Sequence, residues 1–311
     1  MSTRSPLALV AAASAAALLL AGCGGGEADA AGDGEGLTVV AGFYPLEWTA
    51  ERIGGDRVDV SSLTPPGAEA HDLELAPQDV AAVAQADLLV YLDGFQPALD
   101  EAAASEAADA AWDAGRAADL APSAEPHGHE GEEADEEGAL DPHFWLDPTR
   151  LAAVGDALAD RLAELDPDGA ATYEENAAAL RADLEALDAE MRAGLSGCAV
   201  DTLVTSHEAF GYLAERYGFE VVGISGLSPS QEPNPAQLAE ISGLVRERGV
   251  TTIYTETLVD PAVAETVAAE AGVRTAVLDP LEGLSEESPG DDYLDVMRAN
   301  LVTLQEGQSC S

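Results

Sequence analysis

Three histidines and one aspartate stand in short polar segments beside apolar runs. They are His71 in PGAEAHDLE, His143 in DPHFWLDP, His207 in SHEAFGYLAERYG and Asp279 in VLDPLEG. Successive members lie 72, 64 and 72 residues apart, which is far wider than the spacing of ligand pairs in a zinc finger. These gaps predict a site that tertiary folding assembles from both halves of the chain. Three imidazoles and one carboxylate suit a borderline divalent ion, above all zinc.

The types of ligand bear on which metal is bound. Neutral imidazole is a better donor for Zn²⁺ than for Mn²⁺, which prefers more oxygen ligands. We therefore expect zinc, with manganese as the alternative, especially if Asp279 binds through both carboxylate oxygens. Metal-bound imidazoles usually donate their second N–H to a carboxylate or a carbonyl. Glu256 in YTETL is a candidate for that acceptor or for a reserve ligand, and Glu208 and Asp141 are further candidates for the acceptor.

Apolar runs that alternate with helical patterns surround these residues. Strands are expected at the start of 37–48 (before a turn-rich stretch), in 58–65, 86–93, 201–207, 221–225, 251–256 and 275–279, and helices in 75–85, 208–218, 235–249 and 261–272. This alternation predicts βαβ units with parallel sheets. His207 and Asp279 fall at the carboxyl ends of predicted strands, where open α/β sheets bind ligands. The two halves share no detectable sequence repeat.

A long amphipathic helix is predicted between the halves, at about 167–194. Its apolar stripe is formed by Tyr173, Leu180, Leu184, Leu187 and Met191, which recur in steps that match one helix face. At 1.5 Å per residue this helix would span roughly 40 Å. An earlier helix is expected to begin at Pro148, with Asp147 as its N-cap.

The segments DPHFWLDP, SHEAFGYLAERYG, HDLELAPQDV and VLDPLEG together resemble a known family. The family is that of the periplasmic or lipoprotein zinc- or manganese-binding subunits of ABC importers, the cluster A-I solute-binding proteins. The resemblance runs from about Thr38 to near the C-terminus. It implies an α/β fold of two βα lobes with mostly parallel sheets, joined by one long rigid helix, with the metal site in the cleft between the lobes. The lobes would be residues 37–166 and 196–311, and the helix would lie in 167–195.

The family resemblance also bears on the four candidate ligands. It favours a metal-ligand role for His71, His143 and Asp279, each of which could otherwise be a solvated or structurally bonded side chain. The family uses His or Glu at the position of His207, and the His form is associated with a preference for zinc.

The first 36 residues carry the pattern of an exported lipoprotein. Arg4 supplies a positive charge, residues 7–20 are apolar, and Leu20-Ala21-Gly22-Cys23 resembles a lipobox. We expect residues 1–22 to be a signal peptide and Cys23 to carry lipid, with 23–36 as a flexible tether. The protein would then be anchored to the outer face of the cell membrane. A membrane-spanning anchor is the alternative, but the apolar run is shorter than the roughly 20 residues that a spanning helix needs.

The net charge of −46 argues against one broad class of partner. All 13 basic residues are arginines, and they form no basic stripe, so nucleic-acid binding is disfavoured. The acidity could concentrate cations, but solubility or adaptation to salt is the preferred explanation.

Two histidines outside the main set lie in PHGHEGEEADEEG, as His127 and His129. This segment resembles the His- and acid-rich loop of zinc-type members of the family, which could collect zinc for the main site. A solvated acidic loop is an equally good interpretation, because the segment is short.

Cys198 and Cys310 remain once Cys23 is assigned to lipid. An even pair in an exported protein predicts a disulfide. A thiolate zinc site is the less favoured alternative, because neither cysteine has a histidine nearby.

The sequence therefore predicts a binding protein without catalytic activity, acting as a monomer. It would capture Zn²⁺ and deliver it to a membrane permease powered by a cytoplasmic ATPase. A zinc hydrolase is one alternative, but Asp279 would fill the fourth coordination position, and the chain contains neither HExxH nor GxSxG. A surface adhesin is another, since some members of the family were first described as adhesins.

Overall fold

The computed structural model describes residues 36–122 and 140–311. Cys23, the signal segment, all but the last residue of the tether, and the histidines at 127 and 129 lie outside these residues, so the expectations about them stay predictions. Residues 36–311 belong to one compact unit. No helix in the described part of the chain is long and apolar enough to cross a membrane.

The first half contains a four-stranded parallel sheet. Its strands are β1 (Leu37–Ala41), β2 (Val58–Ser62), β3 (Leu88–Tyr91) and β4 (Ala111–Asp113), in the order β2-β1-β3-β4. Apolar side chains alternate between the two faces of this sheet. Val39 packs in the cluster shared with α1 (Tyr44–Gly54), whereas Val40 packs in the cluster that contains Leu99 of α3 (Pro97–Glu106). Because both faces are covered, the inner strands are continuously apolar.

The remaining short elements of the first half are helices and turns around this sheet. They are α2 (Pro77–Gln85), α4 (Gly115–Ala118) and the 3₁₀ turns η1 (Gly55–Arg57) and η2 (Phe144–Leu146). The expected helix at 75–85 is confirmed as α2. The stretch expected to be turn-rich after β1 instead forms α1, because Pro45 stands in its first turn, where a missing N–H removes no helical hydrogen bond.

The second half repeats the same topology. Its strands are β5 (Thr202–Thr205), β6 (Glu220–Gly223), β7 (Thr252–Thr255) and β8 (Arg274–Val277), all parallel in the order β6-β5-β7-β8. Its helices are α7 (Gly211–Tyr217), α8 (Pro235–Arg248), α9 (Ala262–Ala271) and α10 (Tyr293–Gly307). The expected ends of α7, α8 and α9 are confirmed, because Gly218, Gly249 and Gly272 take left-handed conformations directly after them.

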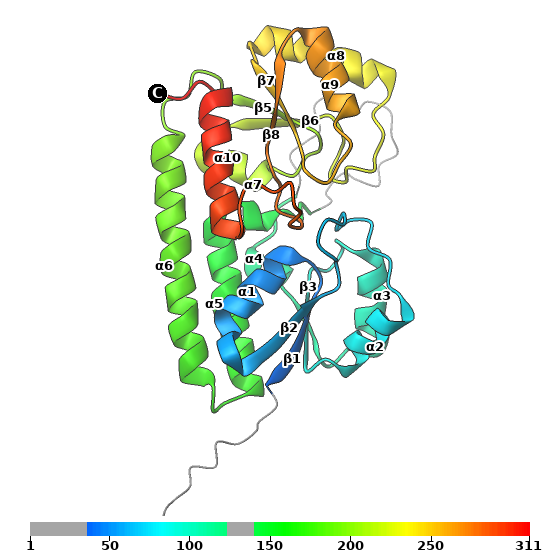
Figure 1. The fold of residues 1–311 in the computed structure, drawn as a ribbon, viewed down its shortest axis with the longest axis vertical. Helices are drawn as coiled ribbons and strands as arrows, with labels where there is room; N and C mark the ends of the chain where they lie inside the picture. The colour runs from blue at the N-terminus through cyan, green and yellow to red at the C-terminus, as the bar shows by residue number, and fades with distance from the viewer. Residues whose placement is uncertain (1–35, 123–139) are drawn as a thin grey trace, which may run out of the picture. The chain divides into compact units, whose positions relative to one another are not determined.

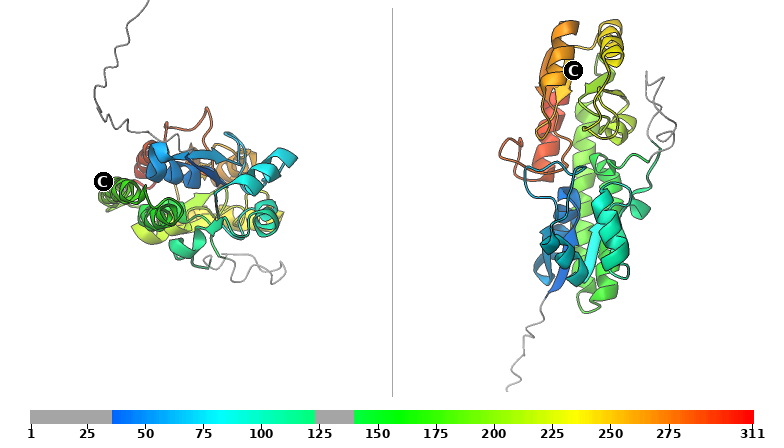
Figure 2. Two further views of the ribbon diagram at one scale, coloured as in Figure 1. Left: turned by 90° about the horizontal axis from the view of Figure 1, so that it is seen from below. Right: turned by 90° about the vertical axis from the view of Figure 1, so that its right-hand side faces the viewer.

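Two long helices follow the first sheet in the chain, and the second of them extends beside both sheets (Figure 1). They are α5 (Pro148–Leu165), whose N-cap Asp147 accepts the Thr149 N–H at 2.8 Å, and α6 (Ala170–Gly194). The predicted stripe of α6 is buried along its whole length, and the helix is about 37 Å long. Figures 1 and 2 show α6 beside α5 near the first sheet and beside α10 near the second. The long helix expected from the sequence is confirmed.

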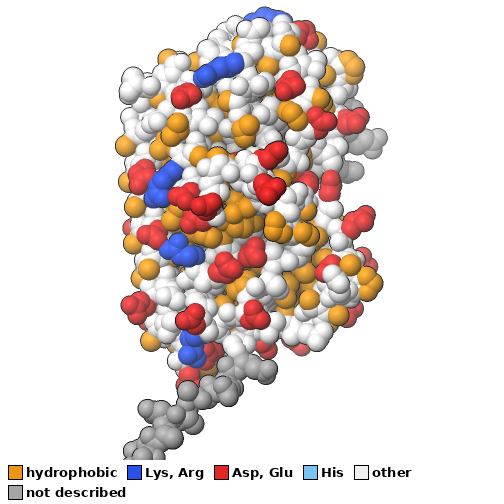
Figure 3. Space-filling view, viewed as in Figure 1, with side chains coloured by type: hydrophobic (Ala, Val, Ile, Leu, Met, Phe, Trp, Pro, Cys, Tyr) orange, Lys and Arg blue, Asp and Glu red, His pale blue; other side chains and the backbone are white. Residues whose placement is uncertain are grey.

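The surface is sparsely basic, as the composition requires. Figure 3 shows acidic side chains scattered over one face, with isolated arginines among them and no visible histidine.

Cys198, just after α6, and Cys310, just after α10, form the expected disulfide. This bond joins the end of the long helix to the end of the chain.

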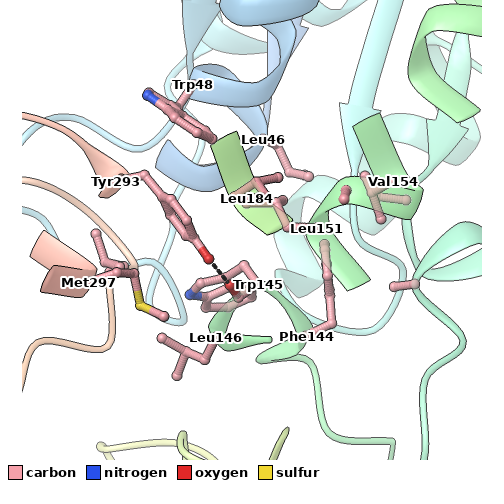
Figure 4. Packing of buried hydrophobic residues seen from close by; sticks show 14 of the residues in the cluster. Leu46, Trp48, Phe144, Trp145, Leu146, Leu151, Val154, Leu184, Tyr293 and Met297 are labelled. Carbon is pink, nitrogen blue, oxygen red and sulfur yellow. Dashed lines mark hydrogen bonds between the residues drawn. The ribbon is translucent and has the colours of Figure 1, made fainter. Parts of the chain in front are cut away.

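One apolar core continues from the first half into the second. Figure 4 shows Trp145 of η2 packed beside Tyr293 and Met297 of α10. The Tyr293 hydroxyl donates to the Trp145 carbonyl at 2.5 Å, and Trp145 Nε1 donates to the carbonyl of Pro280 at 2.7 Å. The segment that precedes Trp145 and the segment that follows Pro280 are therefore held against each other.

Candidate metal centre

The candidate ligands come from segments that follow strands or join elements. His71 lies in the irregular connection between β2 and α2, and His143 directly precedes η2. His207 stands two residues after β5, and Glu256 directly follows β7. The carboxyl ends of parallel strands meet at one edge of a sheet, and this edge of the second sheet faces the loop of His71.

Four side chains meet at this position: His71, His143, His207 and Glu282. One potential ligand atom from each lies within 4.8 Å of the others. The side chains of His143 and His207 are fully buried, that of Glu282 is 1% exposed and that of His71 is 9% exposed. Among the described residues this is the one group of histidine, cysteine and acidic side chains arranged to hold a metal ion.

The spacing of the donor atoms fits a tetrahedral ion. The Nε2 atom of His143 lies 3.3 Å from that of His71 and 3.4 Å from that of His207. Glu282 Oε1 lies 3.5, 3.4 and 3.1 Å from the three Nε2 atoms in chain order. Zinc bonds of about 2.0–2.1 Å at tetrahedral angles place neighbouring ligand atoms about 3.3–3.4 Å apart. Five of the six edges of such a tetrahedron are therefore close to the length that zinc requires.

Carboxylates behind two of the histidines fix their ring orientation. His143 Nδ1 lies 2.8 Å from Asp141 Oδ1, and His207 Nδ1 lies 2.8 Å from Glu256 Oε1. In the neutral ring each Nδ1–H donates to its carboxylate, which leaves the Nε2 lone pair directed at the centre. Asp141 and Glu256 thus occupy the positions expected of such acceptors. Glu208 is not a member of the four-residue group, and its backbone N–H donates to Gly226.

His71 is held by different contacts. Its ring packs edge-on against Phe95, with ring centroids 4.5 Å apart. Its backbone N–H donates to Glu69 Oε1 at 3.0 Å. Burial and the nearby Glu282 carboxylate raise the pKa of Glu69 to about 9, so Glu69 is neutral at pH 7 beside an ionised Glu282.

The other pKa values show how the charges compensate one another. Burial would raise the pKa of Glu282, but hydrogen bonds from the three imidazoles bring it well below its usual range. Burial alone would lower the pKa of both His143 and His207. Hydrogen bonds with Asp141 and Glu282 nevertheless raise the pKa of His143. The charges of Glu256 and Glu282 raise the pKa of His207. Burial lowers the pKa of His71. A cation that replaces protons on these rings would meet the same negative charges.

The sequence prediction for the carboxylate ligand differs from what the structure shows. Asp279 is buried but is not part of the group. Its Oδ1 accepts the Leu281 N–H at 2.8 Å, and its Oδ2 accepts the Thr257 hydroxyl at 3.2 Å. Those bonds direct the Asp279 carboxylate to the backbone of the residues that follow it and to Thr257, not to the histidines. Glu282, three residues later in the same VLDPLEG segment, points to the histidines instead, so the carboxylate candidate is corrected from Asp279 to Glu282.

A signal for Glu282 was present in the sequence but ambiguous. The segment contains two acidic residues, and only Asp279 stands at the expected strand end, where open α/β sheets bind ligands. The turn between them depends on Leu281, which adopts a left-handed backbone with φ of 60°. Leucine rarely takes this conformation, so the sequence gives little reason to expect the reversal that brings the second carboxylate inward.

Comparison with known proteins identifies relatives of the whole folded part. Residues 39–307 match the family described as zinc-uptake complex component A, periplasmic. The high-affinity zinc uptake system protein ZnuA of Bacillus subtilis is 35% identical over 297 residues, covering 90% of each chain. The zinc-binding lipoprotein AdcA of Streptococcus pneumoniae is 36% identical over 277 residues, covering 87% of this chain and 55% of its own length.

Solved structures extend the similarity to the fold. Zn(II)-bound AdcA from Streptococcus pneumoniae has a TM-score of 0.73 at 35% identity, covering 88% of this chain and 58% of that one. The laminin-binding protein Lmb of Streptococcus agalactiae, described as having adhesin and metal-transporting activity, has a TM-score of 0.74 at 33% identity, covering 88% and 100%.

The match with AdcA covers most of this chain but only part of AdcA. The chain spans about half the length of the AdcA proteins that it matches, whereas it matches nearly all of ZnuA. The two-lobed α/β fold and the family resemblance drawn from the four motifs are both confirmed. The chain belongs to the family of periplasmic zinc-uptake component A proteins.

Proposed function

We propose that this protein captures Zn²⁺ outside the cytoplasm and delivers it to a membrane permease driven by a cytoplasmic ATPase. Its ligands would be His71, His143, His207 and Glu282. The observation that carries the proposal is the near-tetrahedral spacing of three imidazole nitrogens and one carboxylate oxygen in a buried position. The names of the relatives, which are zinc-binding and zinc-uptake proteins, support the same function.

The ligand set favours zinc over manganese. Three nitrogen donors suit Zn²⁺, and Mn²⁺ would require more oxygen ligands than one carboxylate supplies through a single oxygen. Glu282 presents Oε1 to all three histidines. A manganese-binding subunit of the same importer type is the alternative that the experiment below tests.

The proposed role is binding without catalysis. A catalytic zinc keeps one position for water or substrate, whereas four protein ligands close a transport or structural site. Four protein donors at spacings close to those of a tetrahedron support such a closed site, and three of them are almost completely shielded from solvent. A hydrolase would need one of these donors to leave before water could bind.

The proposed location follows from the sequence and from the family. The lipobox-like LAGC segment supports lipid attachment at Cys23 on the outer face of the membrane, and the segment 24–36 would let the folded part reach the permease. A periplasmic family description fits an extracytoplasmic site of capture. We propose that the folded part acts as a monomer.

Competitive titration tests the proposal. The metal-stripped chain without residues 1–23 would be titrated with Zn²⁺ and Mn²⁺, beside His207→Ala. We expect one equivalent of zinc to bind tightly, to resist displacement by excess manganese, and to bind much more weakly to the variant. Tighter retention of manganese would identify a manganese carrier, and the absence of stoichiometric binding of either ion would refute a metal-capture function.

A further inference from the structure

The turn that carries Glu282 has an unusual backbone. Leu281 adopts φ of 60° and its side chain is completely buried. A left-handed conformation is unfavourable for a bulky residue, because its Cβ approaches the following carbonyl oxygen. Such residues persist only where surrounding contacts fix them, and they often occur at functional sites.

Two buried polar residues make the contacts that fix this turn. The Asp279 carboxylate accepts the backbone N–H of Leu281 at 2.8 Å. Asn300 of α10 forms two hydrogen bonds with the backbone of Asp279. Its Oδ1 accepts the Asp279 N–H at 3.0 Å, and its Nδ2 donates to the Asp279 carbonyl at 2.7 Å. The side chains of both residues are almost fully buried, so water does not compete for these bonds.

The far side of the turn is tied to the first half of the chain. Trp145 Nε1 donates to the Pro280 carbonyl at 2.7 Å, and the Gly67 N–H donates to the Leu284 carbonyl at 2.8 Å. Between these two anchors, Leu281 and Glu282 are the residues whose backbone must reverse. Glu282 is the side chain of this turn that reaches the histidines.

We propose that Asp279 and Asn300 are positioning residues for the metal site, acting through Glu282. This inference rests on the proposed metal-capture function. Asp279 holds Leu281 in the left-handed conformation, and Asn300 holds Asp279. Without the Asp279 carboxylate the turn relaxes toward negative φ, and Glu282 Oε1 leaves its place 3.1–3.5 Å from the three Nε2 atoms. Asp279 thus sets the geometry of the site without contacting the ion.

The test is a double-mutant cycle with Zn²⁺ and Co²⁺ as probes. Dissociation constants would be measured for the full chain and for Asp279→Ala, Glu282→Gln and the double variant, and Co²⁺ absorption in the visible range would report coordination geometry. Asp279→Ala is expected to weaken zinc binding about 10- to 100-fold, as loss of a residue that orients a ligand typically does. Its Co²⁺ spectrum should approach that of Glu282→Gln. The double variant should bind no more weakly than Glu282→Gln, because both changes remove one interaction.

Two further variants separate positioning from general destabilisation. Asp279→Asn keeps an oxygen that can accept the Leu281 N–H and should restore most of the affinity. Asp166→Ala removes a partly buried carboxylate that bonds Arg57 and Tyr173 and is not part of the metal-site group, and it should leave metal affinity unchanged. If Asp279→Ala does not fold, Asn300→Ala supplies the same comparison, with a weakened affinity and an altered Co²⁺ spectrum expected.

The outcomes distinguish this inference from the proposed function. Absence of zinc binding by the unaltered chain would refute metal capture itself. If the unaltered chain binds zinc and Glu282→Gln weakens it, two results would overturn the positioning role. One is a wild-type Co²⁺ spectrum in Asp279→Ala or Asn300→Ala. The other is an Asp279→Ala effect that adds fully to that of Glu282→Gln, since additivity would mean that Asp279 acts independently.

Discussion

The two halves of the molecule have the same strand order but support their ligands differently. In the second half, His207 follows a buried strand and is backed by Glu256, and Glu282 stands on a turn bonded to α10. In the first half, His143 is likewise buried and backed by Asp141, but His71 lies in an irregular connection and its ring packs against Phe95 without a carboxylate behind it. The comparison shows that His207 has a buried carboxylate partner in its own half, whereas His71, the most exposed of the four side chains, depends on an irregular connection and on ring packing.

The largest expected difference is between the two histidines themselves. His207→Ala removes a fully buried ligand and leaves Glu256 and Glu282 as uncompensated buried acids, so zinc affinity should fall by more than about 100-fold. His71→Ala removes the most exposed ligand, where water can take the vacated position, and its loss should be smaller. Isothermal titration of both variants would measure this ratio. Equal losses would mean that the two halves contribute equally preformed ligands.

The next largest effect should come from the carboxylate behind His207. Glu256→Gln retains size but removes the negative charge that orients the Nδ1–H and stabilises the bound ion. We expect zinc affinity to fall about 10- to 100-fold. Glu208→Gln is the matched control, because Glu208 adjoins His207 in sequence without joining the cluster. A similar loss in both variants would show that general surface charge, rather than the bond to His207, is responsible.

The pH dependence should also separate His207 from His71. Burial would lower the pKa of His207, but Glu256 and Glu282 raise it well above the ordinary value of 6.5, whereas burial lowers that of His71. Zinc must displace any proton on its ligands. Competition by protons therefore begins at higher pH at His207 than at His71, and affinity falls as pH decreases. Each proton displaced changes the dissociation constant about tenfold per pH unit.

Calorimetry of zinc binding in buffers with different ionisation enthalpies would count the released protons. At neutral pH we expect release from the unaltered chain and less release from His207→Ala, with His71→Ala close to the unaltered chain. Proton release that His71→Ala abolishes would reverse the assignment of the two histidines.

The sequence predicted the parts of this arrangement that depend on local pattern. Strand runs, the buried stripe of α6 and the glycines after α7, α8 and α9 all produced correct elements, because periodicity and positive-φ termini are local properties. The three histidines were found through their motifs, and the structure brings them together. Helix α10 and the strand β4 were not among the expected elements. Because α10 supplies Asn300 and Tyr293, the sequence prediction lacked part of the structure that positions the site.

The choice between Asp279 and Glu282 could not be made from pattern. It depends on the reversal at Leu281, which tertiary contacts with Asn300 and Trp145 impose on a residue that would not adopt it alone. Glu256 was predicted as a reserve ligand or an acceptor for a histidine, and the structure places its Oε1 beside His207 Nδ1.

The smallest expected effect concerns the contact that joins the two halves. Tyr293→Phe removes only the hydroxyl that donates to the buried Trp145 carbonyl, which should lower the free energy of unfolding by about 1–2 kcal/mol. Chemical denaturation would measure this, with Tyr173→Phe as a control, since the Tyr173 hydroxyl of α6 bonds Asp166 and forms no hydrogen bond with η2 or α10 in the described part of the chain. If the second half is preformed by its own contacts, as Asn300 and Glu256 indicate, zinc affinity should change less than about threefold in Tyr293→Phe. If the free energy of zinc binding falls by more than the free energy of unfolding does, packing between the halves, rather than the second half alone, sets the geometry of the site.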